Sequence, residues 1–336
     1  MIPSKITSIK DVARRANVSS STVSHVINDT RFVSEITKAK VRQAMNELNY
    51  RMNAVARSLR SRKSRVIAFV APILASETSN YFFMKVAEGI KSVLKQNNYH
   101  LVLSDSHEDP DVEAAKIRVL GSQMIDGLIM APTNRKFDYE SLFGEYPVVY
   151  LDRTPDNSKR DCVVIENKKI SNEAVKTLLD KGYKRIALLT GPVQYLTTTE
   201  ERYEGYIEAI LDAGLAVDTN LIGIGEVSFD GGYRLMDSLI KHNPTAVFIT
   251  DNSMAMGAML YLQEHNISIP QRLAVIAYDE FIWIRITSPS LNVINQPAFE
   301  IGAKAAEVIL MRQDNSTASS QKHRLDAVLT VRQSLD

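Results

Sequence analysis

The chain has 336 residues, of which 45% are hydrophobic and 24% charged. This length allows two or three domains with a sizeable core, and the composition is typical of a soluble globular protein. No uninterrupted apolar run reaches the ~18 residues of a membrane-spanning helix, and the first residues lack the apolar stretch of a signal peptide. We therefore predict a cytoplasmic protein without a membrane partner. The single cysteine, Cys162, excludes an intrachain disulfide and a thiolate zinc cluster, and its apolar neighbours predict a buried thiol.

Charge is distributed unevenly along the chain. Residues 1–65 contain 14 lysines and arginines but only 4 aspartates and glutamates, a net charge of +10. The remaining residues carry 26 basic and 35 acidic side chains, a net charge of −9. A basic segment the size of one small domain, joined to a mildly acidic body, indicates a polyanionic partner for that segment.

Residues 9–28 predict two short helices separated by a break at residues 16–18. Asn17 tolerates the left-handed backbone geometry of a helix end, and Ser19 is a suitable N-cap for the second helix. The polar face of that helix carries Ser20, Ser21, Ser24 and His25. Short polar side chains on a helix fit the major groove of DNA, where they can hydrogen-bond base edges. By themselves, these residues fit an ordinary polar helix face better than a DNA-reading one.

A third helix is predicted over residues 34–48, with Ser34 as its N-cap and apolar side chains at helical spacing. We expect residues 1–50 to form a three-helix headpiece. Residues 53–59 predict a short amphipathic helix, which is marginal in water by itself, and residues 60–65 are too basic to bury. We interpret residues 51–65 as a hinge and linker that can become ordered on DNA.

From Val66 onward, strands alternate with helices through residue 277. Repeated strand–helix units imply parallel sheets with helices on both faces. The span 66–336 is long for one sheet, so we predict an α/β core of two similar lobes with about five strands each. Ligands in such folds bind at the carboxyl ends of the strands, which here means the cleft between the lobes.

Enzyme signatures are weak in this sequence. Gly223-Ile-Gly225 lacks the third glycine of a dinucleotide-binding fingerprint, and neither a Walker A sequence nor a Gly-x-Ser-x-Gly elbow occurs. The six histidines show no metal-ligand spacing, and the acidic segment 107–111 fits a loop and helix start better than a metal site. We therefore predict no catalytic residues, no metal and no cofactor.

The opening segment, Ile9-Lys-Asp-Val-Ala-x-x-Ala-x-Val-Ser-x-x-Thr-Val-Ser-His-Val-Ile-Asn28, resembles the headpiece of the LacI/GalR family of bacterial transcription regulators, and most closely its purine and ribose repressors. Arg31-Phe-Val33 extends the match, and 53–59 looks like the family's hinge helix. The resemblance covers essentially the whole chain, because the body looks like the family's periplasmic-binding-protein-like core. It implies a helix-turn-helix headpiece joined to a two-lobed effector-binding and dimerisation core.

The resemblance assigns DNA-binding roles within residues 1–60. It implies that Ser20, Ser21 and His25 lie in the major groove with Arg31 near its edge. Leu59, with Arg60 beside it, would partly unstack a central base step from the minor groove. An alternative for Leu59 is packing between hinge and core. The sequence Tyr50-Arg-Met52 departs from the family, since many relatives have a proline after the tyrosine, so the hinge geometry is open.

The resemblance also implies an effector site at the strand ends. The matching positions are Phe82, Phe83, Asp152, Arg202, Asp251, Asp279 and Gln296. Carboxylates and an arginine can bind pairs of hydroxyls, and aromatic rings can cover the C–H faces of a sugar. Each residue also has a structural alternative: an aspartate can cap the next helix, Arg202 can pair with a glutamate, and the phenylalanines can belong to the core.

A sugar or sugar derivative is the expected effector. Val227 stands where the purine repressor has an aromatic stacking residue, and the loop 191–201 lacks that repressor's additional arginine. A purine or a phosphosugar remains the alternative within the family. The C-terminal residues lack the leucine heptads of a tetramerisation helix, so we expect a homodimer that binds a near-palindromic operator. We expect this homodimer to be a repressor of carbohydrate-utilisation genes that is controlled by the effector in the core.

Two rival hypotheses from other classes stay open on the sequence alone. One is a sugar-processing α/β enzyme with a basic appendage, which would need an acid–base or nucleophile set in the cleft. The other is a ligand-sensing module that does not bind DNA.

Overall fold

The computed structural model describes residues 7–50, 63–73, 77–314 and 319–335. The chain divides into two compact units, Met1–Ser64 and Arg65–Asp336. The predicted hinge helix at 53–59, which contains Leu59, and the adjacent Arg60 lie outside the described residues.

The N-terminal unit contains three helices, α1 (Ile9–Ala16), α2 (Ser20–Asn28) and α3 (Glu35–Glu47). Asn17 ends α1 in the left-handed conformation, with φ 55°. Ser19 caps α2 by accepting a hydrogen bond from the Thr22 amide at 3.0 Å. These features confirm the predicted break between the first two helices and the predicted cap.

A small core holds the three helices together. Buried apolar side chains of all three helices form it: Val12, Ala13, Ala16, Val23, Val41 and Ala44. Since α2 buries only Val23 completely, much of its surface stays available for a partner.

The second unit contains two six-stranded sheets rather than the five-stranded sheets expected. In spatial order the first sheet comprises β11 (Lys322–Leu325), β5 (Asp161–Ile165), β4 (Val148–Leu151), β3 (Gly127–Met130), β1 (Val66–Ala71) and β2 (His100–Asp105). The second comprises β12 (Val328–Thr330), β10 (Asn292–Asn295), β9 (Ala274–Tyr278), β8 (Ala246–Ile249), β6 (Ile186–Thr190) and β7 (Ile222–Ile224). All the strand pairs are parallel except β10 with β12.

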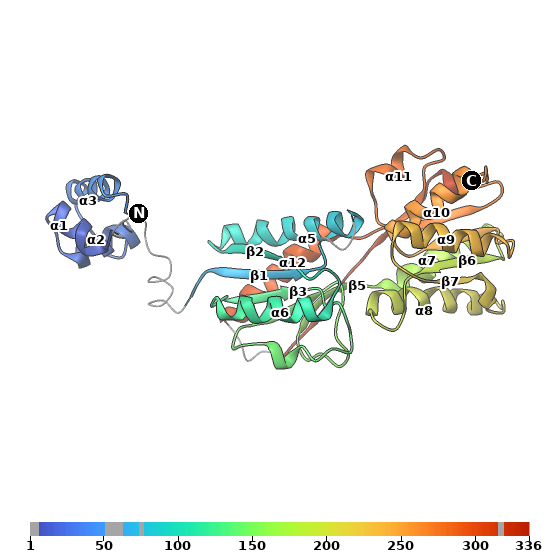
Figure 1. The fold of residues 1–336 in the computed structure, drawn as a ribbon, viewed down its shortest axis with the longest axis horizontal. Helices are drawn as coiled ribbons and strands as arrows, with labels where there is room; N and C mark the ends of the chain where they lie inside the picture. The colour runs from blue at the N-terminus through green and yellow to red at the C-terminus, as the bar shows by residue number, and fades with distance from the viewer. Residues whose placement is uncertain (1–6, 51–62, 74–76, 315–318, 336) are drawn as a thin grey trace, which may run out of the picture. The chain divides into compact units, whose positions relative to one another are not determined.

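Helices cover both faces of each sheet (Figure 1). Those of the first lobe are α5 (Glu77–Gln96), α6 (Pro110–Ser122) and α12 (Ala298–Asp314), with the short η1 (Glu140–Leu142). Those of the second lobe are α7 (Asn167–Asp180), α8 (Thr197–Asp212), α9 (Phe229–Ile240), α10 (Asn252–Glu264) and α11 (Ile282–Ile286), with η2 (Thr219–Leu221) and η3 (Gln333–Leu335). No described helix is both long and apolar enough to cross a membrane.

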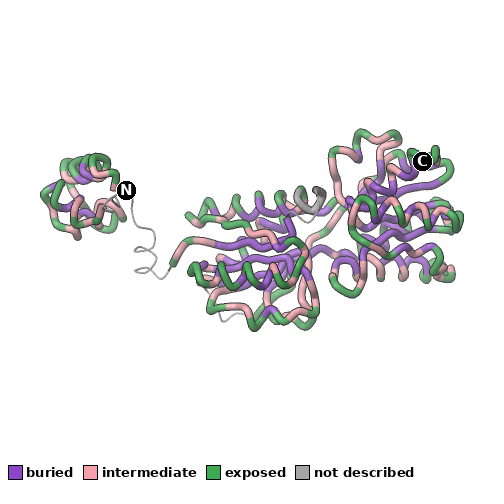
Figure 2. Tube along the Cα trace, in the orientation of Figure 1, coloured by how far each residue is buried: buried purple, intermediate pink, exposed green. Residues whose placement is uncertain are grey.

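The apolar strands explain why two layers of helices are needed. Successive side chains of a strand point to opposite faces. In β1, Phe69 therefore belongs to one core while Ala68 and Val70 belong to another. The same alternation separates Leu188 from Leu189 in β6. Figure 2 shows buried segments running through the middle of each lobe, with exposed segments mainly on the outer surface.

The chain passes between the lobes three times, after β5, after β10 and after β11. Each pass enters or leaves a sheet, so the lobes are built from non-contiguous segments. The carboxyl ends of strands from both sheets therefore provide residues to one shared cavity.

Candidate functional site

A cavity lies between the two lobes of the second unit. All seven predicted effector residues line it: Phe82, Phe83, Asp152, Arg202, Asp251, Asp279 and Gln296. The first three come from the first lobe and the next three from the second, while Gln296 follows β10 at a crossing between them. The structure thus brings the predicted residues together, and their role in binding stays a prediction.

Arg202 is held in a fixed orientation. From α8, its Nε donates to Asn167 Oδ1 and its Nη1 to the Thr250 carbonyl, both at 2.8 Å. The guanidinium carbon lies 3.8 Å from the centroid of the Tyr278 ring, a cation–π contact. Among the described residues Arg202 makes no ion pair with a glutamate, contrary to the structural alternative, and no described side chain hydrogen-bonds its Nη2.

Three aspartates surround the cavity. Burial raises the pKa of Asp152 and Asp251. Burial also raises the pKa of Asp279 to about 6, because desolvation and the nearby Asp251 and Asp152 outweigh the opposing effects of Arg202 and Gln296. A cavity with this many carboxylates favours a ligand that donates hydrogen bonds over one that carries negative charge.

Two of the three aspartates have a left-handed backbone. Asp152 follows β4 with φ 61°, and Asp279 follows β9 with φ 66°. Aspartate tolerates this conformation better than most non-glycine residues, at a modest steric cost. In both cases the turn places a carboxylate at the end of a strand.

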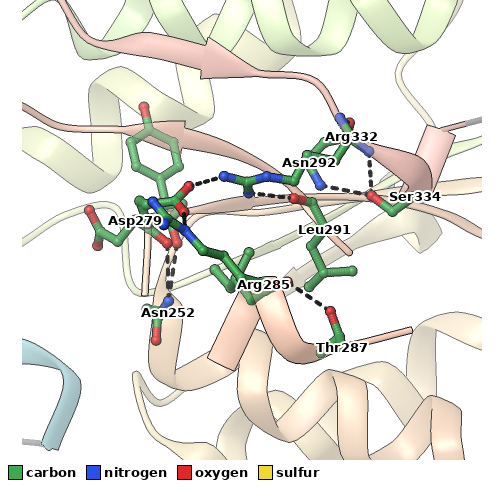
Figure 3. Close-up of polar contacts among 11 residues, drawn as sticks. Asn252, Asp279, Arg285, Thr287, Leu291, Asn292, Arg332 and Ser334 are labelled. Atoms are coloured by element: carbon green, nitrogen blue, oxygen red, sulfur yellow. Dashed lines mark hydrogen bonds and ion pairs between the residues drawn. The ribbon is translucent and has the colours of Figure 1, made fainter. Parts of the chain in front are cut away.

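The loop that carries Asp279 is braced from two sides. Gln296 Nε2 donates to Asp279 Oδ1 at 2.7 Å, and Asn252 Nδ2 donates to the Asp279 carbonyl at 3.4 Å. Arg332 reaches in from the C-terminal segment, where it donates to Glu280 and, at 2.8 Å, to the Leu291 carbonyl (Figure 3). Gln296 thus orients the carboxylate, while Asn252 and Arg332 hold the backbone around it.

Two predicted residues also have structural roles. Asp251 caps α10 by accepting from the Met254 amide at 3.1 Å, as one alternative expected. Phe83 is only 2% exposed and packs against Phe69 in the core of the first lobe. Phe82, which is half-buried, forms an edge contact with Phe83 at a centroid distance of 5.1 Å. Both phenylalanines nevertheless line the cavity.

Sequence reasoning missed Arg153 and Asn252, which also line the cavity. Arg153 Nε is buried without a hydrogen-bond partner among the described residues, although it lies 3.2 Å from Asp152 Oδ2. Gln296 Oε1 is equally buried and unpartnered. Arg153 Nε faces the charge of Asp152, whereas Gln296 Oε1 is a buried acceptor that has no partner among the described residues. Their adjacency to Asp152 and Asp251 was the available sequence signal.

In the first unit, the predicted DNA-contacting residues lie on α2 and just beyond it. Ser21 and Arg31 are exposed, and Ser20, Ser24 and His25 are half-buried. His25 Nδ1 lies 2.8 Å from Thr30 Oγ1, which orients the imidazole. Asn28 Nδ2 donates to the Ser24 carbonyl at 2.8 Å. These contacts leave polar groups of α2 in place for base edges.

Comparisons with known proteins agree with this arrangement. A family described as bacterial regulatory proteins, lacI family, matches residues 8–53. A second, described as periplasmic binding proteins and sugar binding domain of LacI family, matches residues 67–327.

Individual relatives match along nearly the whole chain. The chain is 35% identical over 309 residues to the HTH-type transcriptional repressor PurR of Vibrio atlanticus, covering 90% of this chain and 91% of that one. It is 34% identical over 329 residues to the ribose operon repressor of Escherichia coli K12, covering 96% and 98%. The fold is that of the Lac repressor dimer bound to operator and the anti-inducer ONPF, with TM-score 0.87, 24% identity and 98% and 99% coverage.

Proposed function

Because this chain belongs to the LacI family of bacterial regulatory proteins, it is a DNA-binding transcription regulator, and we propose that a small sugar bound between its core lobes controls it. Residues 1–50 are the DNA-binding headpiece, 51–65 the hinge and linker, and 66–336 the effector-binding and dimerisation core. The matched relatives are repressors, which disfavours the enzyme hypothesis. A regulator of this family works on the chromosome, so we place it in the cytoplasm.

One observation carries the sugar proposal: three aspartates and two arginines converge on a cavity that also has an aromatic wall. Sugar hydroxyls donate to Asp152, Asp251 and Asp279 and accept from Arg202 and Arg153. Phe82 and Phe83 cover the C–H face. Phosphosugars suit this cavity less well, since a phosphate would meet three carboxylates.

Sequence identity to the relatives does not distinguish a sugar effector from a purine effector, because the two named repressors are 35% and 34% identical to this chain. The purine alternative therefore deserves a direct test. Against it stands Val227, an aliphatic side chain at the cavity wall where the family's purine repressor has a stacking aromatic residue.

DNA binding follows from the headpiece. We propose that α2 enters the major groove with Ser20, Ser21, Ser24 and His25 at base edges and Arg31 at the groove's edge. Leu59 and Arg60, which lie outside the described residues, are assigned to the minor groove at the centre of the operator. Two chains related by two-fold symmetry then read a near-palindromic site.

Effector and operator are coupled through the arrangement of the lobes. A ligand shifts an equilibrium only when it binds one arrangement better than the other. Arg202 connects the cavity to the lobe arrangement, because the side chain proposed to bind the sugar also donates a hydrogen bond to Asn167. Asn167 lies where the chain first crosses from one lobe to the other. Operator titrations with and without the sugar show whether the sugar strengthens or weakens DNA binding.

Thermal unfolding of the full chain tests the effector class. D-ribose, other pentoses and hexoses, ribose 5-phosphate and adenine are added in turn. A neutral sugar at 100 times its dissociation constant should stabilise the protein by about 2.7 kcal/mol. Arg202→Ala should abolish the shift, whereas Arg234→Ala, at an exposed ion pair with Glu226, should retain it. A shift with adenine alone would replace the sugar proposal by the purine one.

A further inference from the structure

A polar bridge joins the two lobes beside the cavity. Arg135 lies in the loop between β3 and η1 of the first lobe, and its backbone amide donates to the Tyr195 carbonyl of the second lobe at 2.9 Å. Its guanidinium binds Asp156 of its own lobe at 2.6 Å through Nε and Glu200 of the second lobe through Nη1. One arginine therefore links two carboxylates that belong to different lobes.

The loop that carries Arg135 is anchored from beneath. Glu113 on α6 is fully buried, and its Oε2 accepts from Tyr139 Oη at 2.5 Å and from Thr133 Oγ1 at 3.0 Å. The Asn134 amide donates in turn to Tyr139 Oη at 3.2 Å. Both ends of the loop are thus fixed to the body of the first lobe, so Arg135 is oriented before it meets Glu200.

The segment of the second lobe that Arg135 holds also forms the cavity wall. Tyr195 and Glu200 flank Leu196, Thr198 and Thr199, all of which line the cavity. A second backbone contact reinforces the bridge, because the Thr154 amide donates to Thr197 Oγ1 at 3.2 Å. Moving the lobes apart on this side would break these contacts and displace the wall.

We propose that Arg135 is a positioning residue that latches the lobes in the arrangement that closes the cavity, and so raises affinity for the effector. The proposal deepens the proposed function, since it rests on a ligand occupying this cavity. Arg135 itself does not line the cavity and acts through the second-lobe segment 195–200. The apparent dissociation constant of a ligand rises as the population of the competent arrangement falls, so loss of the latch weakens binding.

The lobe arrangement can be measured on the full chain without a ligand. Nitroxide labels on Lys116→Cys in α6 and Leu211→Cys in α8 report the distance between the lobes by double electron–electron resonance. These two sites suit labelling because both are exposed, whereas the native Cys162 is buried. Labelled protein is diluted with unlabelled protein so that distances within one chain dominate. Arg135→Gln and Glu200→Gln should each shift the distribution to longer distances, and the double variant should shift it no further.

Arg160→Gln is the matched control, because Arg160 binds Glu140 within the first lobe. It should leave the distribution unchanged. Distributions of Arg135→Gln and wild type that superimpose would overturn the latch.

Titration with D-ribose, or with whichever sugar shifts thermal unfolding most, gives the functional readout. A partly exposed ion-pair network predicts about fivefold weaker binding for Arg135→Gln and for Glu200→Gln, with Arg160→Gln unchanged. Sugar binding that is equal in Arg135→Gln and wild type would also refute the proposal. If no sugar binds the wild type, the effector proposal fails, while the distance measurement still decides whether the latch exists.

Discussion

Asp279 combines two unfavourable features in one residue. Its φ of 66° strains the backbone, and its carboxyl is desolvated enough for the pKa to rise to about 6. Neither feature stabilises the empty protein. Both become understandable if the carboxylate is kept in place for a ligand, since binding sites commonly retain groups that lower stability.

Replacing Asp279 by asparagine should therefore stabilise the empty protein. A carboxyl whose folded pKa is raised contributes most to stability below its unfolded pKa, near 3.8, and this contribution is lost as pH rises through 6. Asparagine keeps an acceptor for Gln296 without the charge. Asp279→Asn should raise the free energy of unfolding by about 3 kcal/mol at pH 8 and by roughly half as much at pH 5. Denaturant unfolding at the two pH values measures this, and a pH-independent difference would contradict it.

At this scale the sequence located the cavity residues well but not completely. Asp152 follows an apolar strand of the first sheet, and Asp251 and Asp279 follow apolar strands of the second. The strand ends predicted a cleft between the lobes, and the family resemblance implied which residues line it. Arg153 and Asn252 directly follow Asp152 and Asp251, and both members of each pair line the cavity, because local backbone angles turn adjacent side chains toward it. For Asp152 the decisive angle is a positive φ that no sequence pattern revealed.

At the scale of elements, two neighbouring serines at the start of α2 have different expected roles: Ser19 caps the helix, and Ser20 is predicted to contact DNA. Ser19→Ala removes the hydrogen bond to the Thr22 amide and should destabilise the helix by about 1 kcal/mol. Hydrogen exchange of residues 9–28 in the full chain should then accelerate about fivefold. Ser20→Ala, inside the first turn, should leave exchange unchanged and instead weaken binding to an operator selected from random DNA. If Ser20→Ala left operator affinity intact, Ser20 would lose its assigned role.

Element prediction succeeded where apolar runs were long. The strands β3 and β8 are buried along their whole length and β1 from Ile67 onward, and their sequences are correspondingly apolar. The apolar pattern did not identify β5, β7, β10, β11 or β12 as strands, nor the 17-residue α12 as a helix. β11, with the polar sequence Lys322–Leu325, shows no strand alternation because it lies at a sheet edge. It joins the first sheet only because the chain returns from the second lobe, a non-local event that local patterns do not encode.

At the scale of the whole molecule, symmetry requires a surface through which two chains associate. Among the described residues, α11 presents Ile282 and Ile286 with 76% and 78% of their surface exposed, while Ile284 between them is buried. Positions i and i+4 share one helix face. Tyr81, which is 42% exposed, extends this apolar surface by ring contact with Phe281, at a centroid distance of 4.7 Å. Contiguous exposed apolar surface of this kind is typical of association sites.

We therefore predict that α11 contributes to the homodimer contact. Ile282→Asp combined with Ile286→Asp should shift the full chain from dimer to monomer in sedimentation velocity, because charges at the centre of an interface are poorly tolerated. The same double variant should bind a near-palindromic operator much more weakly, since one headpiece reaches only one half-site. Val119→Asp, at a 54% exposed apolar position on α6, is the control and should change neither property. A double variant that stays dimeric at the wild-type concentration would place the contact elsewhere on the core.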